Sequence, residues 1–145
     1  MKQALDIEGA SAKDKLFSLT REGFLPAAQF RLCAVAWARE VMPHARELAA
    51  KSAVEVAERF ALGQATIEEL HSAHVAARRA TLNVNALSAD RAAAATTLPD
   101  ARSAAWETLA QARNLAVWMW PTPGAEKPVN ERFLEIALQV INKTL

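Results

Sequence analysis

The chain has 145 residues, a formal net charge of +1 and a single cysteine. This length fits one domain over residues 1–145, and one cysteine excludes an intramolecular disulfide framework and favours a reducing, cytoplasmic location. The charge is spread along the chain and no segment reaches the ~18 apolar residues of a membrane span, which argues against nucleic-acid and membrane partners. Abundant alanine, few glycines and no tyrosine favour helices over strands, so we expect an all-α fold: a compact bundle of five to seven helices.

The first two helices are indicated by the signals at their ends. Ser11 can cap a first helix, and the turn at Gly23 closes an N-terminal unit over 1–24. A second helix is expected over 26–42, with Arg31 directed away from its apolar face. That face makes Cys33 a packed core thiol and consists of Phe30, Cys33, Ala34, Trp37 and Val41.

A third helix is expected over 47–62, after the interruption at Pro43 and before a left-handed stop at Gly63. Alanine at every fourth position gives it a smooth ridge that a neighbouring helix can approach closely. The ridge consists of Ala45, Ala49, Ala53, Ala57 and Ala61.

A fourth helix is expected over 66–84, starting at a capping box formed by Thr66 and Glu69. Its apolar face consists of Ile67, Leu70, Val75, Ala77 and Leu82. Three polar side chains project from the middle of this face, namely His71, His74 and Arg78. Burying unpaired polar groups costs several kcal/mol, roughly, so we expect all three to be largely buried and paired.

A short helix over 89–97 and a longer one over 100–120 follow. The longer helix carries Arg113 at the centre of its apolar face, which consists of Trp106, Leu109, Ala110, Val117 and Trp120. Inward arginines more often form buried ion pairs than anion sites. We therefore expect Arg78 and Arg113 to pair with acids such as Glu40 or Glu107.

Trp118 and Met119 point away from the main face of the helix over 100–120. A proline-rich loop over 121–129 follows, and Asn130 can cap the final helix. Two alternatives stand for the exposed pair. They form a contact surface together with Trp120 and Pro121, or the wide apolar arc of the final helix folds back over Trp118.

Catalytic and metal-binding patterns are weak. Glu68, His71 and His74 share one stretch of helix, but a di-metal carboxylate site needs a second Glu-x-x-His element, which the chain lacks. Neither a nucleophile elbow nor a glycine-rich phosphate loop is found. We therefore expect a non-catalytic protein with no cofactor and no metal.

Three segments carry a family resemblance: RLCAVAWAREVMP at 31–43, SAVEVAERFALGQATIEEL at 52–70 and HVAARRA at 74–80. Their pattern is a helix with a cysteine, a short loop, a helix ending in glycine, a capping box and a helix rich in alanine and histidine. Over about residues 25–86 the chain resembles all-helical immunity proteins of bacterial polymorphic-toxin systems, and helical segments of large planctomycete-type bacterial proteins. The resemblance implies a bacterial cytoplasmic protein that neutralises a toxin by binding it.

Two hypotheses follow. In the first, the protein binds a protein partner, such as a toxin or a second copy of itself in a homodimer. The contact residues would come from Trp118, Met119, Trp120, Pro121, His71, His74, Arg78 and Arg113. In the second, the protein is a helical bundle that binds a small molecule or a metal, with His71, His74, Arg78 and Arg113 lining an interior pocket.

Overall fold

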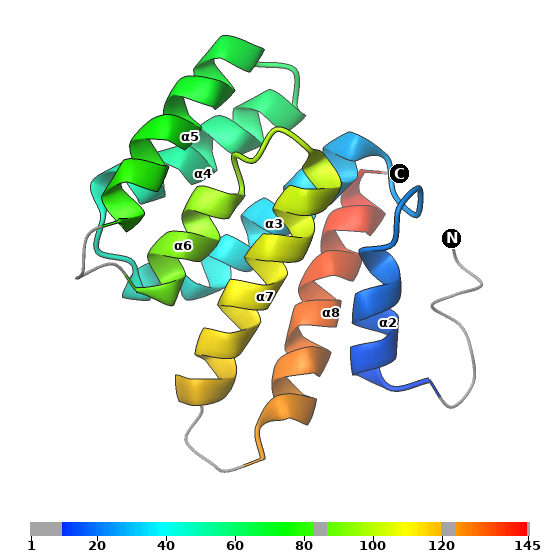
Figure 1. The fold of residues 1–145 in the computed structure, drawn as a ribbon. Helices are drawn as coiled ribbons and strands as arrows, with labels where there is room; N and C mark the ends of the chain where they lie inside the picture. Colours follow the sequence, from blue (N-terminus) through cyan, green and yellow to red (C-terminus); the bar gives the residue numbers. More distant parts are fainter. Residues whose placement is uncertain (1–9, 83–86, 120–123, 145) are drawn as a thin grey trace.

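The computed structural model describes residues 10–82, 87–119 and 124–144. Within these ranges the fold is all-α, with seven α-helices and no strand (Figure 1), so the helical bundle expected from the composition is confirmed. In chain order the elements are α2 (Ala12–Leu19), α3 (Ala27–Val41), the 3-10 helix η1 (Met42–His44), α4 (Leu48–Ala61), α5 (Ile67–Thr81), α6 (Ser88–Ala95), α7 (Ala101–Met119) and α8 (Glu126–Lys143). Of these helices, none is long and apolar enough to cross a membrane.

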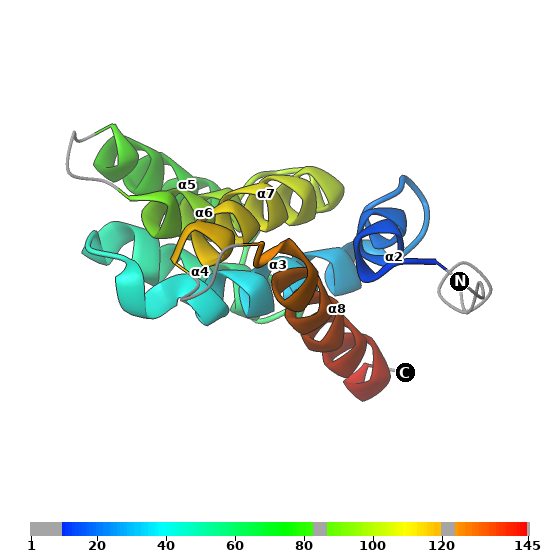
Figure 2. The ribbon, with the colours of Figure 1, turned by 90° about the horizontal axis from the view of Figure 1, so that it is seen from below.

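The helices form two layers. Figure 2 shows α5, α6 and α7 on one side and α4, α3 and α8 on the other. Helix α3 is central because it contacts α4, α6, α7 and α8. Helix α2 packs against α8 at one edge.

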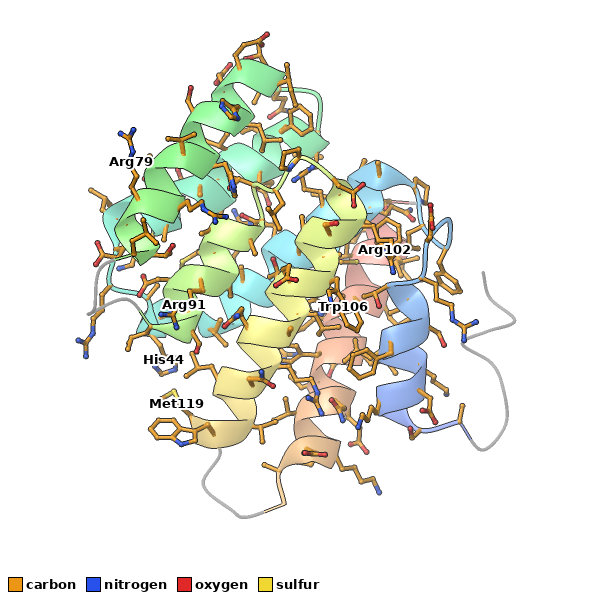
Figure 3. The ribbon with its side chains drawn as sticks, viewed as in Figure 1. His44, Arg79, Arg91, Arg102, Trp106 and Met119 are labelled. Atoms are coloured by element: carbon orange, nitrogen blue, oxygen red, sulfur yellow. The ribbon has the colours of Figure 1, made fainter. Side chains whose placement is uncertain are left out.

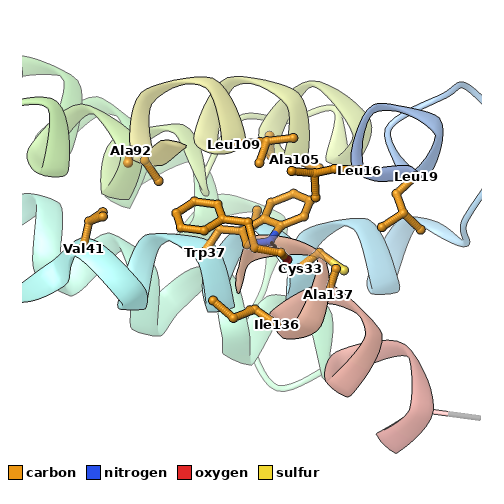
Figure 4. Packing of buried hydrophobic residues seen from close by; sticks show 14 of the residues in the cluster. Leu16, Leu19, Cys33, Trp37, Val41, Ala92, Ala105, Leu109, Ile136 and Ala137 are labelled. Atoms are coloured by element: carbon orange, nitrogen blue, oxygen red, sulfur yellow. Dashed lines mark hydrogen bonds between the residues drawn. The ribbon is translucent and has the colours of Figure 1, made fainter. Parts of the chain in front are cut away.

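The core is built around the apolar face of α3, and all five residues expected on that face are buried. Trp37 is 1% exposed, and its Nε1 donates a hydrogen bond to the backbone oxygen of Phe133 at 2.9 Å, which fixes α8 against α3 (Figure 4). Burial raises the pKa of the Cys33 thiol to about 12. Cys33 is therefore a packed core group, as expected.

The helix ends that are encoded by nearby capping residues or by a glycine form as expected. The Asp14 N–H donates to Ser11 Oγ at 3.1 Å, which confirms the first cap. The capping box of α5 is complete, because the Glu69 N–H donates to Thr66 Oγ1 at 3.1 Å and the Thr66 N–H returns a bond to Glu69 Oε1 at 3.3 Å. Gly63 ends α4 with φ of 75°.

The start of the last helix differs from the expectation. Helix α8 begins at Glu126, so the loop is shorter than 121–129, and the cap expected at Asn130 is wrong. Pro128 lies in the first turn, where the N–H that proline lacks has no intrahelical partner to lose. Asn130 is instead 4% exposed inside the helix.

The apolar faces expected for α4 and α5 are only partly buried. In α4, Ala53 and Ala57 are fully buried, whereas Ala49 is half-buried and the closest packing extends to the neighbouring positions Ala50 and Val54. In α5, Leu70 and Ala77 are buried while Ile67 and Leu82 are 53% and 77% exposed. The buried side of each helix is set by its neighbours in the bundle, which the local pattern does not specify.

A buried carboxylate joins two elements that lie far apart in the chain. Asp90 is fully buried, and its Oδ1 accepts from the backbone N–H groups of Arg46 and Glu47 at 2.8 Å each. Its Oδ2 accepts from the N–H of Leu87 at 2.9 Å. Asp90 therefore fixes the start of α6 against the segment that leads into α4.

Candidate interaction face

Helix α5 carries the three polar side chains that stand out in the sequence. His71 and Arg78 are exposed and His74 is half-buried, so the expectation that all three are largely buried is wrong for two of them. Leu70 and Ala77 mark the buried side of the helix. His71 and Arg78 each follow one of these residues and are therefore turned by about 100° from that side.

His74 is the one member of the three that has a side-chain partner within the described ranges. Its Nδ1 lies 3.1 Å from Thr97 Oγ1. Because the Thr97 hydroxyl donates its own proton to the backbone oxygen of Ala94 at 2.7 Å, the ring donates from Nδ1 and keeps Nε2 as an acceptor. Burial lowers the pKa of His74, and the nearby charge of Arg78 acts in the same direction. Both effects favour the neutral form of the ring.

The connection between α6 and α7, over residues 96–100, is held by Arg31. This side chain is 2% exposed, and its Nη1 donates to the backbone oxygens of Thr96 and Leu98 at 2.7 Å each. Its Nη2 donates to the oxygen of Pro99 at 3.0 Å, and the guanidinium lies 5.3 Å from the ring centroid of Phe60. Desolvation lowers the pKa of Arg31. The sequence placed Arg31 outside the apolar face of α3, but the end of α6 covers that side of the helix.

Two hollows follow one another along α5. The first has a volume of about 530 Å³, and its walls are mainly apolar. It is lined by Ile67, Glu68, Leu70, His71, Ser72, Thr97 and Pro99. The second, of about 430 Å³, lies between α5, α6 and α7 and is lined by His74, Arg78, Thr81, Arg91, Ala94, Ala95, Leu98, Ser103, Glu107 and Gln111. Together they form what we call the α5 groove.

The second hollow is more basic than acidic. Arg78 and Arg91 are both exposed, and neither forms an ion pair with any residue in the described part of the chain. Glu107 is the one acidic residue in its lining. Arg91 could not be identified from the sequence, since only the packing of α6 between α5 and α7 brings it to the groove (Figure 3).

Trp118 lies at the far end of α7 and is 82% exposed. The alternative in which α8 folds back over it is therefore wrong. Met119 is 44% exposed and lines a separate hollow of about 180 Å³ that also includes His44 (Figure 3). Trp120 and Pro121, which were expected to join this surface, lie outside the described residues.

The α5 groove and Trp118 lie on one face of the molecule. Residues 107, 111, 114 and 118 recur at helical spacing, so Glu107, Gln111 and Trp118 share one side of α7. Seven residues separate Gln111 from Trp118, which corresponds to about 10 Å along the helix axis. The fold thus brings the polar strip of α5 and the exposed tryptophan onto the same side, although they are far apart in the sequence.

Arg113 does not belong to this face. Its side chain is 14% exposed, and its Nε donates to Asn130 Oδ1 at 2.5 Å. Its Nη2 lies 3.9 Å from a carboxylate oxygen of Glu126, and the guanidinium lies 6.0 Å from the ring centroid of Phe17. Arg113 therefore links α7 to α8 and α2 and has a structural role.

The ion-pair partners expected for the inward arginines are also wrong. Glu40 pairs with Arg132, whose Nε lies 2.9 Å from Glu40 Oε1. Glu107 lines the same hollow as Arg78 but forms no ion pair with it. Residue type alone does not determine which acid pairs with an arginine, because pairing depends on how the helices cross.

Glu68, His71 and His74 do not assemble into a metal site. Among the described residues, no group of three or more histidine, cysteine, aspartate or glutamate side chains is placed to hold a metal ion. Comparison with known proteins finds no matching family model, curated protein or solved structure. The functional argument therefore depends on the geometry of the face itself.

Proposed function

We propose that the protein is a non-catalytic binding protein that holds a protein partner on the face formed by α5, α6 and α7. In the manner of an immunity protein, it neutralises a bacterial toxin by direct contact. The observation that carries the proposal is Trp118, 82% exposed at the end of a helix of 19 residues and on the same side as the α5 groove. An exposed tryptophan on a rigid helix offers a large contact area at a low entropy cost, and tryptophan is enriched among interface hot spots.

The geometry favours this hypothesis over a ligand-binding interior. The second hypothesis requires His71, His74, Arg78 and Arg113 to line one pocket. Arg113 lies between α7 and α8, whereas the other three lie on α5, with two of them exposed. Both hollows of the groove are open at the molecular surface. An open hollow suits a macromolecular partner better than a small molecule, which is usually enclosed.

The test uses the product of the gene adjacent to the one that encodes this protein, because toxin and immunity genes are expected to be neighbours. The two proteins are co-expressed, and their affinity is measured by titration calorimetry. We expect a stable complex and protection of the host from growth arrest. The variant Trp118→Ala weakens the complex by ~30-fold, which corresponds to a hot spot of about 2 kcal/mol.

Leu62→Ala serves as the matched control. Leu62 is 53% exposed, follows α4 and lines neither hollow of the groove. Its replacement should leave the affinity unchanged. Equal affinities for Trp118→Ala and the unaltered protein would contradict the proposal. A dimer of this chain that dissociates on Trp118→Ala would assign the face to a second copy and would also contradict it.

A further inference from the structure

The α5 groove changes character along its length. At the start of α5 the first hollow presents mainly apolar surface, and its lining includes Pro99 and Ile67, which is 53% exposed. Towards the end of α5 the second hollow presents two guanidinium groups, Arg78 and Arg91, that have no carboxylate partner among the described residues. From Ile67 to Thr81 the helix rises by about 21 Å, at about 1.5 Å per residue.

Free guanidinium groups at the rim of a hollow are suited to carboxylates. Arginine presents several donors in a planar fork that matches the two oxygens of a carboxylate, and such charge-assisted bonds are the stronger ones. A single acid, Glu107, shares the lining of this hollow with them and comes from α7. The hollow therefore carries an excess of positive charge that its own lining does not compensate.

We propose that the α5 groove receives an acidic segment of the partner protein. The carboxylates of that segment contact Arg78 and Arg91, and its apolar side chains occupy the hollow beside Ile67. This inference rests on the proposed function and specifies the chemistry of the partner. Charge complementarity is its basis, since an apolar pocket next to a basic one favours a segment with apolar residues at one end and acidic residues at the other.

A nucleic acid is a poorer occupant. A phosphate backbone needs a track of several basic side chains, and a flanking glutamate opposes it. Here two arginines face one glutamate, and the neighbouring hollow is apolar. A protein segment with both apolar and acidic side chains matches both hollows of the groove.

The direct test uses a synthetic amphipathic peptide, long enough to span the groove, with leucines on one face and glutamates towards its end. A second peptide has glutamine in place of every glutamate. Binding is followed by fluorescence anisotropy and by amide shifts of the isotope-labelled protein. We expect the acidic peptide to bind at least about tenfold more tightly, with shifts confined to 67–81, 91–98 and 103–111. Equal affinities, no binding or shifts centred elsewhere would overturn the inference.

Two double charge-reversal variants test whether Arg78 and Arg91 bind the carboxylates of the segment. Arg78→Glu combined with Arg91→Glu should weaken binding of the acidic peptide by about tenfold or more, because like charges then face each other. Arg21→Glu combined with Arg79→Glu is the control. These residues are exposed, line neither hollow and change the net charge by the same amount. The same loss in both double variants would indicate a general charge effect and would overturn the inference.

The remaining outcomes separate this inference from the proposed function. If Trp118→Ala weakens the complex with the adjacent gene product but the reversal of Arg78 and Arg91 does not, the acidic segment is wrong and the binding face stands. If neither change weakens the complex, both proposals fail. Binding of phosphatidylserine vesicles without binding of the acidic peptide would assign the basic hollow to an anionic membrane and would overturn the inference.

Discussion

Replacing Arg31 with methionine removes the group that holds the connection between α6 and α7. Methionine keeps the length and apolar volume of the side chain but has no donor. The three backbone oxygens that accept from the guanidinium, at 2.7, 2.7 and 3.0 Å, then lose these hydrogen bonds. These oxygens belong to the segment that contributes Leu98 to the lining of one hollow of the α5 groove and Thr97 and Pro99 to the lining of the other.

The expected cost follows from the burial of these groups. Leaving a buried polar group without a partner costs about 1–3 kcal/mol, and the oxygens of Thr96 and Leu98 lie at or near the buried side of the connection. Removing the buried guanidinium offsets part of this cost, because Arg31 is 2% exposed and loses its hydration on folding. We therefore expect Arg31→Met to lower the free energy of unfolding by about 2–4 kcal/mol.

Urea denaturation followed by far-ultraviolet circular dichroism measures this loss. Arg39→Met is the control, because Arg39 lies on the same helix, is exposed and pairs with Glu58 at the surface. Loss of such a surface pair costs about 1 kcal/mol or less. If Arg31→Met is no less stable than Arg39→Met, the hydrogen bonds of Arg31 do not hold the connection between α6 and α7, and our account of this segment is wrong.

Three further predictions concern groups that are buried or half-buried. Asp90→Ala should lower the free energy of unfolding by at least about 2 kcal/mol in urea melts, because it leaves three backbone N–H groups without their acceptor; a loss within experimental error would refute this role. Folding lowers the pKa of His74, so the unfolded chain binds more protons than the folded protein. The contribution of His74 to the free energy of unfolding is therefore present above its ordinary pKa of about 6.5 and is lost as the pH falls below that value. Urea midpoints of the unaltered protein should therefore fall more steeply below that pH than those of His74→Gln, and parallel curves would contradict the shift. Cys33, with its pKa near 12, should resist alkylation by iodoacetamide at neutral pH in the folded protein and react once the chain is unfolded in urea; rapid labelling of the folded protein would contradict its burial.

Features encoded by neighbouring residues could be predicted from the sequence. The cap at Ser11, the capping box at Thr66 and the stop at Gly63 each depend on residues within one turn, and all three form. The apolar face that contains Trp37 was also correct, because α3 is central and is covered on most sides. The cap expected at Asn130 fails although the signal is local, because the helix starts one turn earlier.

Features that join distant segments could not be predicted. Arg31 donates to the backbone oxygen of Thr96, which lies 65 residues further along the chain. Asp90 accepts from the N–H groups of Arg46 and Glu47, which precede it by 44 and 43 residues. For α5, the periodicity identified His71, His74 and Arg78 as unusual but assigned the wrong burial to His71 and Arg78. Their surroundings depend on where α4, α6 and α7 pack, and the composition of one helix does not determine this.

The proposed binding face on α5, α6 and α7 is tested most directly by finding which backbone amides the adjacent gene product protects in the complex. Hydrogen exchange of the protein is compared with and without the partner. We predict added protection along α5, at the end of α6 and on the side of α7 that leads to Trp118, with α2 and α8 unchanged. Protection confined to α2 and α8, with α5 and α7 exchanging as in the free protein, would contradict the account.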